Sequence, residues 1–212
     1  MVGDRIIVIA ALQRCFGDLC DGATTIVAGS TWEEDEVELL HYVKIHPEIK
    51  FIIAPHEIDA ENLKSIKKEF PNSVFYSELE KTENQKQKTE NVLIIDNIGI
   101  LSRLYNYATI AYVGGAFGTD GVHNVLEAAV YGKPVVFGPE YAKYEEAIEL
   151  LEAGGGESIS DPIGLEKVLT GLVDNEPERI KKGNAARDFV YSKAGASEKI
   201  MQFIQEKRLL TS

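Results

Sequence analysis

Short apolar runs separated by amphipathic or polar stretches recur along the first two thirds of the chain. Six of these runs are apolar at successive rather than alternating positions, and most are rich in β-branched residues. Continuous hydrophobicity over so few residues is typical of strands that are covered on both faces, as in a parallel sheet. The six runs lie at residues 25–28, 51–54, 73–76, 92–95, 110–113 and 134–137.

Stretches with helical spacing lie between most of these runs. Residues 35–45 place Val37, Leu40 and Val43 on one face, and residues 59–70 show the same spacing. Further helices are expected at residues 99–108, 124–131, 144–153, 162–173, 177–192 and 197–207. The alternation predicts an α/β fold, a Rossmann-like, doubly wound parallel sheet of roughly six strands. Ligands of such sheets bind beyond the carboxyl ends of the strands.

The chain length of 212 residues suits a single domain, since domains average roughly 150 residues. We expect a linker and a first helix over residues 1–22, the Rossmann-like core over 23–192 and a C-terminal helix over 193–212. The first residues contain no clear strand, as in a two-lobed enzyme cut at its interlobe linker, and an ordinary flexible terminus is equally compatible. A solvated loop is predicted for residues 77–91, and the glycines at 154–156 predict a helix stop followed by a flexible link.

The charge balance limits the partners of this chain. It carries 22 Lys and Arg against 34 Asp and Glu, a net charge of -12. Such a surface repels phosphate backbones and anionic lipid headgroups, so we expect neither nucleic acid nor a membrane surface as a direct partner. Backbone amides can still offer an anionic small molecule a local positive pocket.

The apolar run nearest the start covers Ile6 to Leu12, whereas a membrane-spanning helix needs about 20 residues. No small-residue cleavage site follows that run, so we expect neither direct membrane insertion nor a signal peptide. The two cysteines, Cys15 and Cys20, match no common zinc-binding spacing. They are interpreted as reduced packing residues of a cytoplasmic protein, and no metal site is predicted.

The strongest candidate site follows the run at 110–113, where four glycines occur within eight positions. Gly114, Gly115 and Gly121 let the backbone approach a ligand closely or take positive φ. Asn124 with Glu127 three residues later predicts a helix start of the capping-box type, whose free amides suit a phosphate. A glycine-rich turn that merely leads into a helix is the alternative. The spacing is not that of a dinucleotide fingerprint, and the Walker sequence is absent.

Other predicted strand ends also carry candidate residues. Ser30 and Thr31 follow the first strand and predict either an anion contact or a simple helix cap. Pro55 and His56 follow the second strand, a position that makes a functional histidine more plausible. The fourth strand ends in a turn that contains Asn97, Ile98 and Gly99, whose backbone can contact a base.

Together these residues resemble the C-terminal half of the 3-deoxy-D-manno-octulosonic acid (Kdo) transferases that act on lipid A. The resemblance covers almost the whole chain but only the family's second lobe. Its most specific part is the block from Gly114-Gly115 to His123-Asn124-Val125-Leu126-Glu127. The other matching pieces are Ala28-Gly29-Ser30-Thr31, Asp96-Asn97-Ile98-Gly99, Leu104-Tyr105, Tyr112-Val113, Gly132-Lys133-Pro134-Val135 and Phe137-Gly138-Pro139.

The resemblance implies an inverting GT-B glycosyltransferase with two Rossmann-like lobes, the donor being bound mostly by the second. The donor would be CMP-Kdo and the acceptor a lipid A precursor at the cytoplasmic face of the inner membrane. The family's general base, a glutamate, and its acceptor surface lie in the N-terminal domain. This chain alone is therefore expected to bind the donor weakly and to catalyse nothing, and no cofactor is implied.

The resemblance also implies roles for individual residues. Glu127 matches the glutamate that binds the ribose, Asn124 and the amides after Gly121 would hold the phosphate, and residues 97–99 would contact cytosine. Ser30 and Thr31 would lie near the phosphate or the sugar carboxylate. The whole implied donor-binding set is Ser30, Thr31, Pro55, His56, Asn97, Ile98, Gly99, Gly114, Gly115, Gly121, His123, Asn124 and Glu127.

Two positions depart from the family pattern. His56 stands where the family often has arginine, and an imidazole is a weaker partner for an anion than a forked guanidinium. Ala116 stands where the family often has serine, which removes one hydroxyl.

Two other functions remain open from the sequence. The chain is compatible with a lobe of another GT-B enzyme, a UDP-sugar transferase or UDP-sugar epimerase, although Lys143 is the only nearby cation for a diphosphate. It is also compatible with a nucleotide-binding or protein-interaction module that has no catalytic activity.

Overall fold

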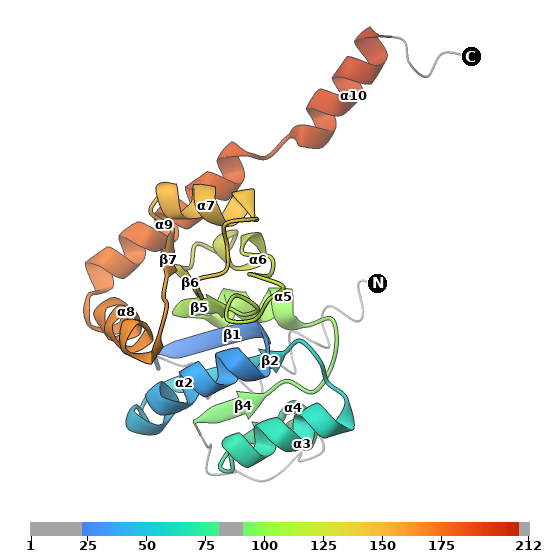
Figure 1. Ribbon diagram of the computed structural model, residues 1–212. Helices are drawn as coiled ribbons and strands as arrows, with labels where there is room; N and C mark the ends of the chain where they lie inside the picture. The colour runs from blue at the N-terminus through green and yellow to red at the C-terminus, as the bar shows by residue number, and fades with distance from the viewer. Residues whose placement is uncertain (1–22, 81–90, 208–212) are drawn as a thin grey trace.

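The computed structural model describes residues 23–80 and 91–207, and these residues form an α/β fold (Figure 1). Seven strands form one sheet in the order β3-β4-β2-β1-β5-β6-β7, and every neighbouring pair is parallel. The strands are β1 (Thr25–Thr31), β2 (Lys50–Pro55), β3 (Val74–Phe75), β4 (Val92–Ile94), β5 (Ile110–Val113), β6 (Val135–Phe137) and β7 (Gly156–Ser158). The predicted Rossmann-like parallel sheet is thus confirmed.

Helices cover both faces of the sheet, which explains why its strands are apolar at successive positions. One layer contains α2 (Glu33–Ile45), α3 (Ala60–Glu69) and α8 (Pro162–Asp174). The other contains α5 (Leu101–Leu104), the 3-10 helix η1 (Tyr105–Tyr107), α6 (Leu126–Ala129), α7 (Glu145–Glu152) and α9 (Glu176–Ser192). Along β1, Ile26 and Ala28 face the α2 layer whereas Val27 faces the α9 layer. Both cores therefore meet at the same buried strands.

Two further helices complete the described residues. The short helix α4 (Tyr76–Glu80) occupies part of the stretch that was predicted to be a loop, and residues 81–90 of that stretch lie outside the described residues. The last helix, α10 (Ala196–Glu206), extends away from the body of the domain (Figure 1). Its apolar residues Ile200, Met201 and Phe203 are exposed.

The sheet has one strand more than the apolar runs predict. β7 forms where a flexible link was expected after the glycines at 154–156, so that expectation was wrong. Gly155 is buried, and a Cβ there would lie 2.6 Å from Cα of Ala186. The helix α9 therefore packs directly against the backbone of Gly155. Close packing and pairing with β6, rather than apolar side chains, hold this edge strand.

Two predicted helices also differ from the structure. In α2 the buried apolar residues are Leu39, Tyr42 and Val43, whereas Val37 is 54% exposed, so the predicted face was partly wrong. The helix predicted over 124–131 is reduced to the four residues of α6. A helix of one turn has few aligned peptide dipoles, and the charge expected at its N-terminus is correspondingly small.

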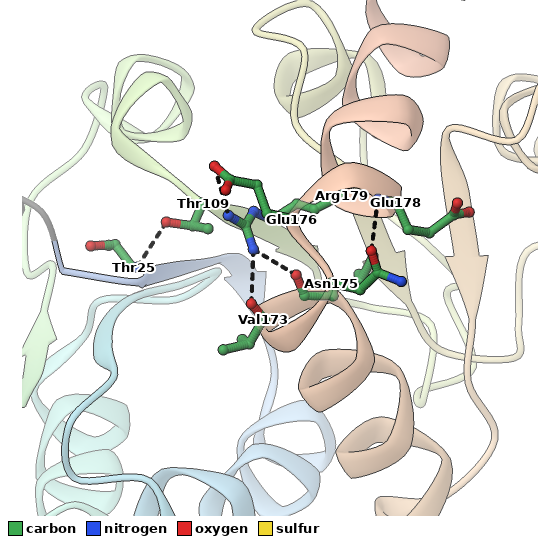
Figure 2. A network of polar contacts seen from close by, with 8 residues as sticks. Thr25, Thr109, Val173, Asn175, Glu176, Glu178 and Arg179 are labelled. Carbon is green, nitrogen blue, oxygen red and sulfur yellow. Dashed lines mark hydrogen bonds and ion pairs between the residues drawn. The ribbon is translucent and has the colours of Figure 1, made fainter.

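The corner between α8 and α9 lies near the start of β1 (Figure 2). Arg179 donates to the carbonyl oxygens of Leu172 and Val173 at 2.8 and 2.9 Å, which satisfies the last turn of α8. Asn175 accepts from the amide of Glu178 at 3.1 Å and caps the start of α9. These contacts satisfy the end of α8 and the start of α9 and fix the corner between the two helices.

Some predictions fall on residues that the structure does not describe. These are the linker and first helix over 1–22, with Cys15 and Cys20, and the last residues, 208–212. Within the described ranges 23–80 and 91–207, no helix has both the length and the apolar character that crossing a bilayer requires.

Candidate nucleotide site at the carboxyl edge of the sheet

The order of the strands predicts where a ligand binds. From the central strand β1 the chain builds β2, β4 and β3 on one side and then β5, β6 and β7 on the other. The topological switch point therefore lies between β1 and β5, and open α/β sheets bind ligands in the crevice beyond such a point. The turns that follow β1 and β5 are the two glycine-containing segments that the sequence singles out.

The turn after β1 has an unusual backbone. Ser30 adopts φ 52° at an irregularity in the pairing with β2, a conformation that is costly for a residue other than glycine. Thr31 is buried, and its hydroxyl donates to Glu36 at 2.9 Å. The hydroxyl of Thr31 is thus directed into the protein and has no hydrogen left to give to a ligand, whereas Ser30 is half-buried at the edge of the crevice.

Asp35 joins the turns after β1 and β5. Its carboxylate is fully buried and accepts from the amide of Trp32 at 2.9 Å, the amide of Gly115 at 2.8 Å and the hydroxyl of Tyr112 at 2.7 Å. Burial raises the pKa of Asp35 above its ordinary value of 3.8, and these three hydrogen bonds oppose the rise. Asp35 therefore fixes the spacing between the turns after β1 and β5.

Glu36 is a second buried carboxyl group beside Asp35. Only 4% of it is exposed, and burial is the main cause that raises its pKa to about 7, with the hydrogen bond from Thr31 opposing the rise. The neighbouring charge of Asp35 raises this pKa further. The first turn of α2 thus holds two buried acidic groups.

The glycine-rich loop after β5 folds back on itself. Gly115 has φ 94°, and a Cβ there would lie 2.4 Å from the carbonyl oxygen of Gly121, so only glycine fits this approach. Gly121 has φ 90° and packs against the ring of Tyr144. The hydroxyl of Tyr144 donates to the carbonyl of Asp120, which ties the loop to the start of α7.

Several amides of this loop already have an acceptor within the chain. Gly114 donates to the carbonyl of Gly29 at 2.9 Å, and Val122 and His123 donate to the carbonyls of Glu140 and Gly114 at 2.9 and 3.0 Å. Two of the amides after Gly121 that were expected to hold a phosphate, those of residues 122 and 123, therefore already have an acceptor within the chain. Among the described residues, the amides of Asn124 and Val125 have no hydrogen-bond acceptor.

Asn124 and Glu127 lie together at the mouth of the loop. Asn124 accepts from the amide of Leu126 at 3.1 Å and donates its side-chain amide to Glu127 at 3.3 Å. Asn124 is exposed and Glu127 is half-buried, so neither side chain is lost in the core. Burial, and to a smaller extent the charge of Glu127, raise the pKa of Tyr105, whose hydroxyl group lies against Gly29.

Three aromatic side chains gather beside this loop. The indole N–H of Trp32 donates to Nε2 of His123 at 3.0 Å, and the planes of these two rings differ by only 11°. His56 stacks on both, with ring centroids 4.7 Å from Trp32 and 4.5 Å from His123. The sequence indicated both histidines as candidates but not Trp32. The available signal was a tryptophan directly after the Gly-Ser-Thr turn at a strand end.

The turn that contains Asn97, Ile98 and Gly99 lies further along the same edge. It follows β4, which is separated from β5 by β2 and β1, so roughly 14 Å of sheet separates it from the glycine-rich loop. Ile98 is 86% exposed, and Oδ1 of Asn97 is buried without a hydrogen-bond partner among the described residues. Pro55, at the end of β2, is buried beside Thr31. The structure therefore does not bring residues 97–99 into contact with the loop after β5.

A cavity of about 480 Å³ opens beside the glycine-rich loop. Its wall combines the apolar side chains of Val122 and Val125 with the polar groups of His123 and Asn124, and α7 contributes Glu146 opposite them. This volume and this mixture are typical of small-molecule sites. In the described part of the chain, no cluster of three or more His, Cys, Asp or Glu residues has the arrangement of a metal site.

No protein-family model matches the chain, but individual proteins do. It is 33% identical over 186 residues to a 3-deoxy-D-manno-octulosonic acid transferase of Aquifex aeolicus, covering 85% of this chain and 49% of that protein. It is 32% identical over 188 residues to a bifunctional glycosyltransferase/methyltransferase of Fusobacterium nucleatum, covering 87% of this chain and 26% of that protein. The chain therefore spans about half the length of the first relative and about a quarter of the second.

A solved structure has the same fold. The C-terminal CMP-Kdo binding domain of WaaA from Acinetobacter baumannii superimposes with a TM-score of 0.71 at 19% identity. The match covers 87% of this chain and 96% of that domain, so the two correspond over nearly their whole lengths.

Proposed function

Because this chain is a relative of the 3-deoxy-D-manno-octulosonic acid (Kdo) transferases, we propose that it is the donor-binding domain of such an enzyme. The complete enzyme is an inverting GT-B glycosyltransferase that moves Kdo from CMP-Kdo to a lipid A precursor in lipopolysaccharide biosynthesis. The general base and the acceptor site belong to an N-terminal domain. That domain is the partner of this one, and through it the enzyme works at the cytoplasmic face of the inner membrane.

The observation that carries the proposal is a coincidence of motif and cavity. Residues 123–126, in the block that most specifically resembles the family, line the cavity beside the switch point of the sheet. Glu127 completes the motif and is hydrogen-bonded to Asn124. A motif that served only to start a helix would not need an open cavity in front of it.

The free groups at this cavity suit the nucleotide end of the donor. The unpaired amides of Asn124 and Val125 are donors for the single phosphate. Glu127 uses one carboxylate oxygen for Asn124, and its other oxygen has no partner among the described residues, so it can accept from a ribose hydroxyl. We assign cytosine to the turn at residues 97–99. The ribose and the base would extend toward this turn along the carboxyl edge of the sheet. CMP is the leaving group, and fixed donors stabilise the charge that develops on it.

The test is nucleotide binding by the chain itself, measured by isothermal titration calorimetry with CMP and with UDP. We expect CMP to bind more tightly than UDP. Glu127→Ala should weaken CMP binding about 5- to 150-fold, because it removes charged hydrogen bonds worth about 1–3 kcal/mol. The matched control is Glu152→Ala, an exposed glutamate near the end of α7, which should leave the affinity unchanged.

Each alternative function gives a different result in the same titrations. Tighter binding of UDP would indicate a lobe of a UDP-sugar enzyme. A folded chain that binds neither nucleotide at millimolar concentration would favour a protein-interaction module without catalytic activity. Circular dichroism of the Glu127 variant is needed beside the titration, because Glu127 also holds Asn124 at the start of α6.

A further inference from the structure

The indole of Trp32 makes one directed contact in the aromatic cluster, and that contact fixes a chemical state of its neighbour. Nε1 of Trp32 lies 3.0 Å from Nε2 of His123, and the planes of the two rings differ by 11°. An indole nitrogen is only a donor, so Nε2 of His123 must be the acceptor and carries no hydrogen. A neutral imidazole with a bare Nε2 has its hydrogen on Nδ1.

The groups around His123 determine whether its ring is charged. His56 stacks on its ring at 4.5 Å, Asp120 lies in the same loop and Glu146 lines the cavity from α7. Burial and the neighbouring His56 lower the pKa of His123, and Asp120 opposes this effect. Protonation would also place a hydrogen on Nε2 and break the bond from Trp32. The neutral Nδ1–H form is therefore the one that this packing selects near pH 7.

The Nδ1–H group of His123 is left available. Its ring edge of Cδ2 and Nε2 faces Gly115 and Trp32, and among the described residues Nδ1 has no hydrogen-bond partner. His123 is half-buried, lines the cavity and immediately precedes the two unpaired amides of Asn124 and Val125. One neutral donor thus stands next to two others on the same wall.

We propose that Trp32 is a positioning residue that fixes His123 as the Nδ1–H tautomer, so that His123 donates this hydrogen to an anionic oxygen of the bound nucleotide. The identity of the ligand rests on the function proposed above, whereas the assignment of the tautomer does not depend on it. It gives the cavity a third neutral donor. It also explains why a tryptophan follows the strained turn after β1, where it contacts a loop 91 positions away.

The first test reads the tautomer directly and needs no ligand. In protein labelled with ¹⁵N-histidine, two-bond ¹H–¹⁵N correlation spectra at pH 7.5 distinguish a protonated Nδ1 from a protonated Nε2. We expect wild-type His123 to be protonated on Nδ1 alone, and Trp32→Phe to relax this preference while it keeps an aromatic ring against His56. Protonation of wild-type His123 on Nε2 would overturn the positioning role of Trp32 whether or not a nucleotide binds.

The second test is a double-mutant cycle with CMP. Trp32→Phe should weaken CMP binding about five-fold, the effect of one neutral hydrogen bond. His123→Asn keeps an amide donor near the position of Nδ1 but has no tautomer to fix. In that background Trp32→Phe should change the affinity less than two-fold.

The cycle separates positioning from support of the fold. An equal loss from Trp32→Phe in both backgrounds would show that Trp32 only supports the loop, and would overturn the proposal. A folded wild-type chain with the Nδ1–H tautomer that does not bind CMP would overturn the nucleotide contact, while the tautomer assignment would stand.

Discussion

Replacing Asp35 tests whether one buried carboxylate holds the turns after β1 and β5 together. Asp35→Ala removes the acceptor of three hydrogen bonds of 2.7–2.9 Å, from Trp32, Tyr112 and Gly115. A buried donor left without a partner costs about 1–3 kcal/mol, and two of the three donors belong to fully buried residues. Relief of the buried charge offsets part of this cost, so we expect a net loss of about 3–5 kcal/mol of unfolding free energy.

Asp35→Asn should behave very differently, although it removes the charge. Its carbonyl oxygen can take the place of Oδ2, which accepts from both backbone amides, and its NH₂ group can donate to the hydroxyl oxygen of Tyr112. Both backbone amides and the hydroxyl oxygen then keep a partner, and the loss of the buried charge offsets the hydroxyl hydrogen of Tyr112, which no longer has an acceptor. We therefore expect this variant to lie within about 1 kcal/mol of the wild type at neutral pH.

Urea denaturation followed by fluorescence is the assay, since Trp32 is the only tryptophan of the chain and lies within the site. With a slope of about 2 kcal/mol per M, Asp35→Ala should lower the midpoint by roughly 1.5–2.5 M. Glu34→Ala, at an exposed acidic position in the same helical turn, is the matched control and should change stability by less than about 0.5 kcal/mol. An Asp35→Ala variant as stable as this control, or an Asp35→Asn variant as unstable as Asp35→Ala, would refute the reasoning.

Two further predictions concern the same crevice. In the unfolded chain Glu36 has its ordinary pKa of 4.5, whereas in the folded chain burial raises this pKa to about 7. Ionisation of Glu36 therefore costs no stability below pH 4.5, and stability falls by about 3 kcal/mol as pH rises from 4.5 to about 7. Glu36→Gln keeps an acceptor for Thr31 and should remove this fall, which urea midpoints between pH 4.5 and 8 would measure; equal pH profiles for both proteins would contradict it. Gly121→Ala forces a Cβ to 2.4 Å from Tyr144 at φ 90° and should cost about 1–3 kcal/mol, together with weaker CMP binding. Gly171→Ala, in α8 with no atom within 4 Å of its Cβ, is the control and should stabilise the chain by about 0.5–1 kcal/mol, so a loss at both glycines would point to a general effect of alanine.

The sheet was predictable because a strand that is buried on both faces is apolar at successive positions. The six apolar runs all became strands, and their helical intervals placed the layers on the two faces. β7 has no such apolar run, because Gly156, Glu157 and Ser158 are held by pairing with β6 and by the approach of α9. The buried face of α2 was misjudged because it includes Asp35 and Glu36, and apolar spacing cannot reveal a buried acid.

The same limit applies to the site. Ser30, His56, His123 and Asn124 were predictable as candidates because each follows a predicted strand, and the fold gathers the strand ends at one edge. The roles of Trp32 and Asp35 depend on partners 91 and 77–80 positions away, and nothing local distinguishes them from a helix cap and an exposed acid. The use of loop amides within the chain was equally invisible, because it depends on how residues 114–123 fold back.

The charges around the cavity favour a donor with one phosphate. Within the described chain, its lining includes Asp120 and Glu146 but neither lysine nor arginine. An anion there depends on neutral donors that are already oriented, namely the amides of Asn124 and Val125 and, as proposed, Nδ1–H of His123. A second phosphate would bring further negative charge near those carboxylates with no cation to offset it. A CMP-linked sugar, the donor of the proposed function, therefore fits these charges better than a UDP-linked sugar.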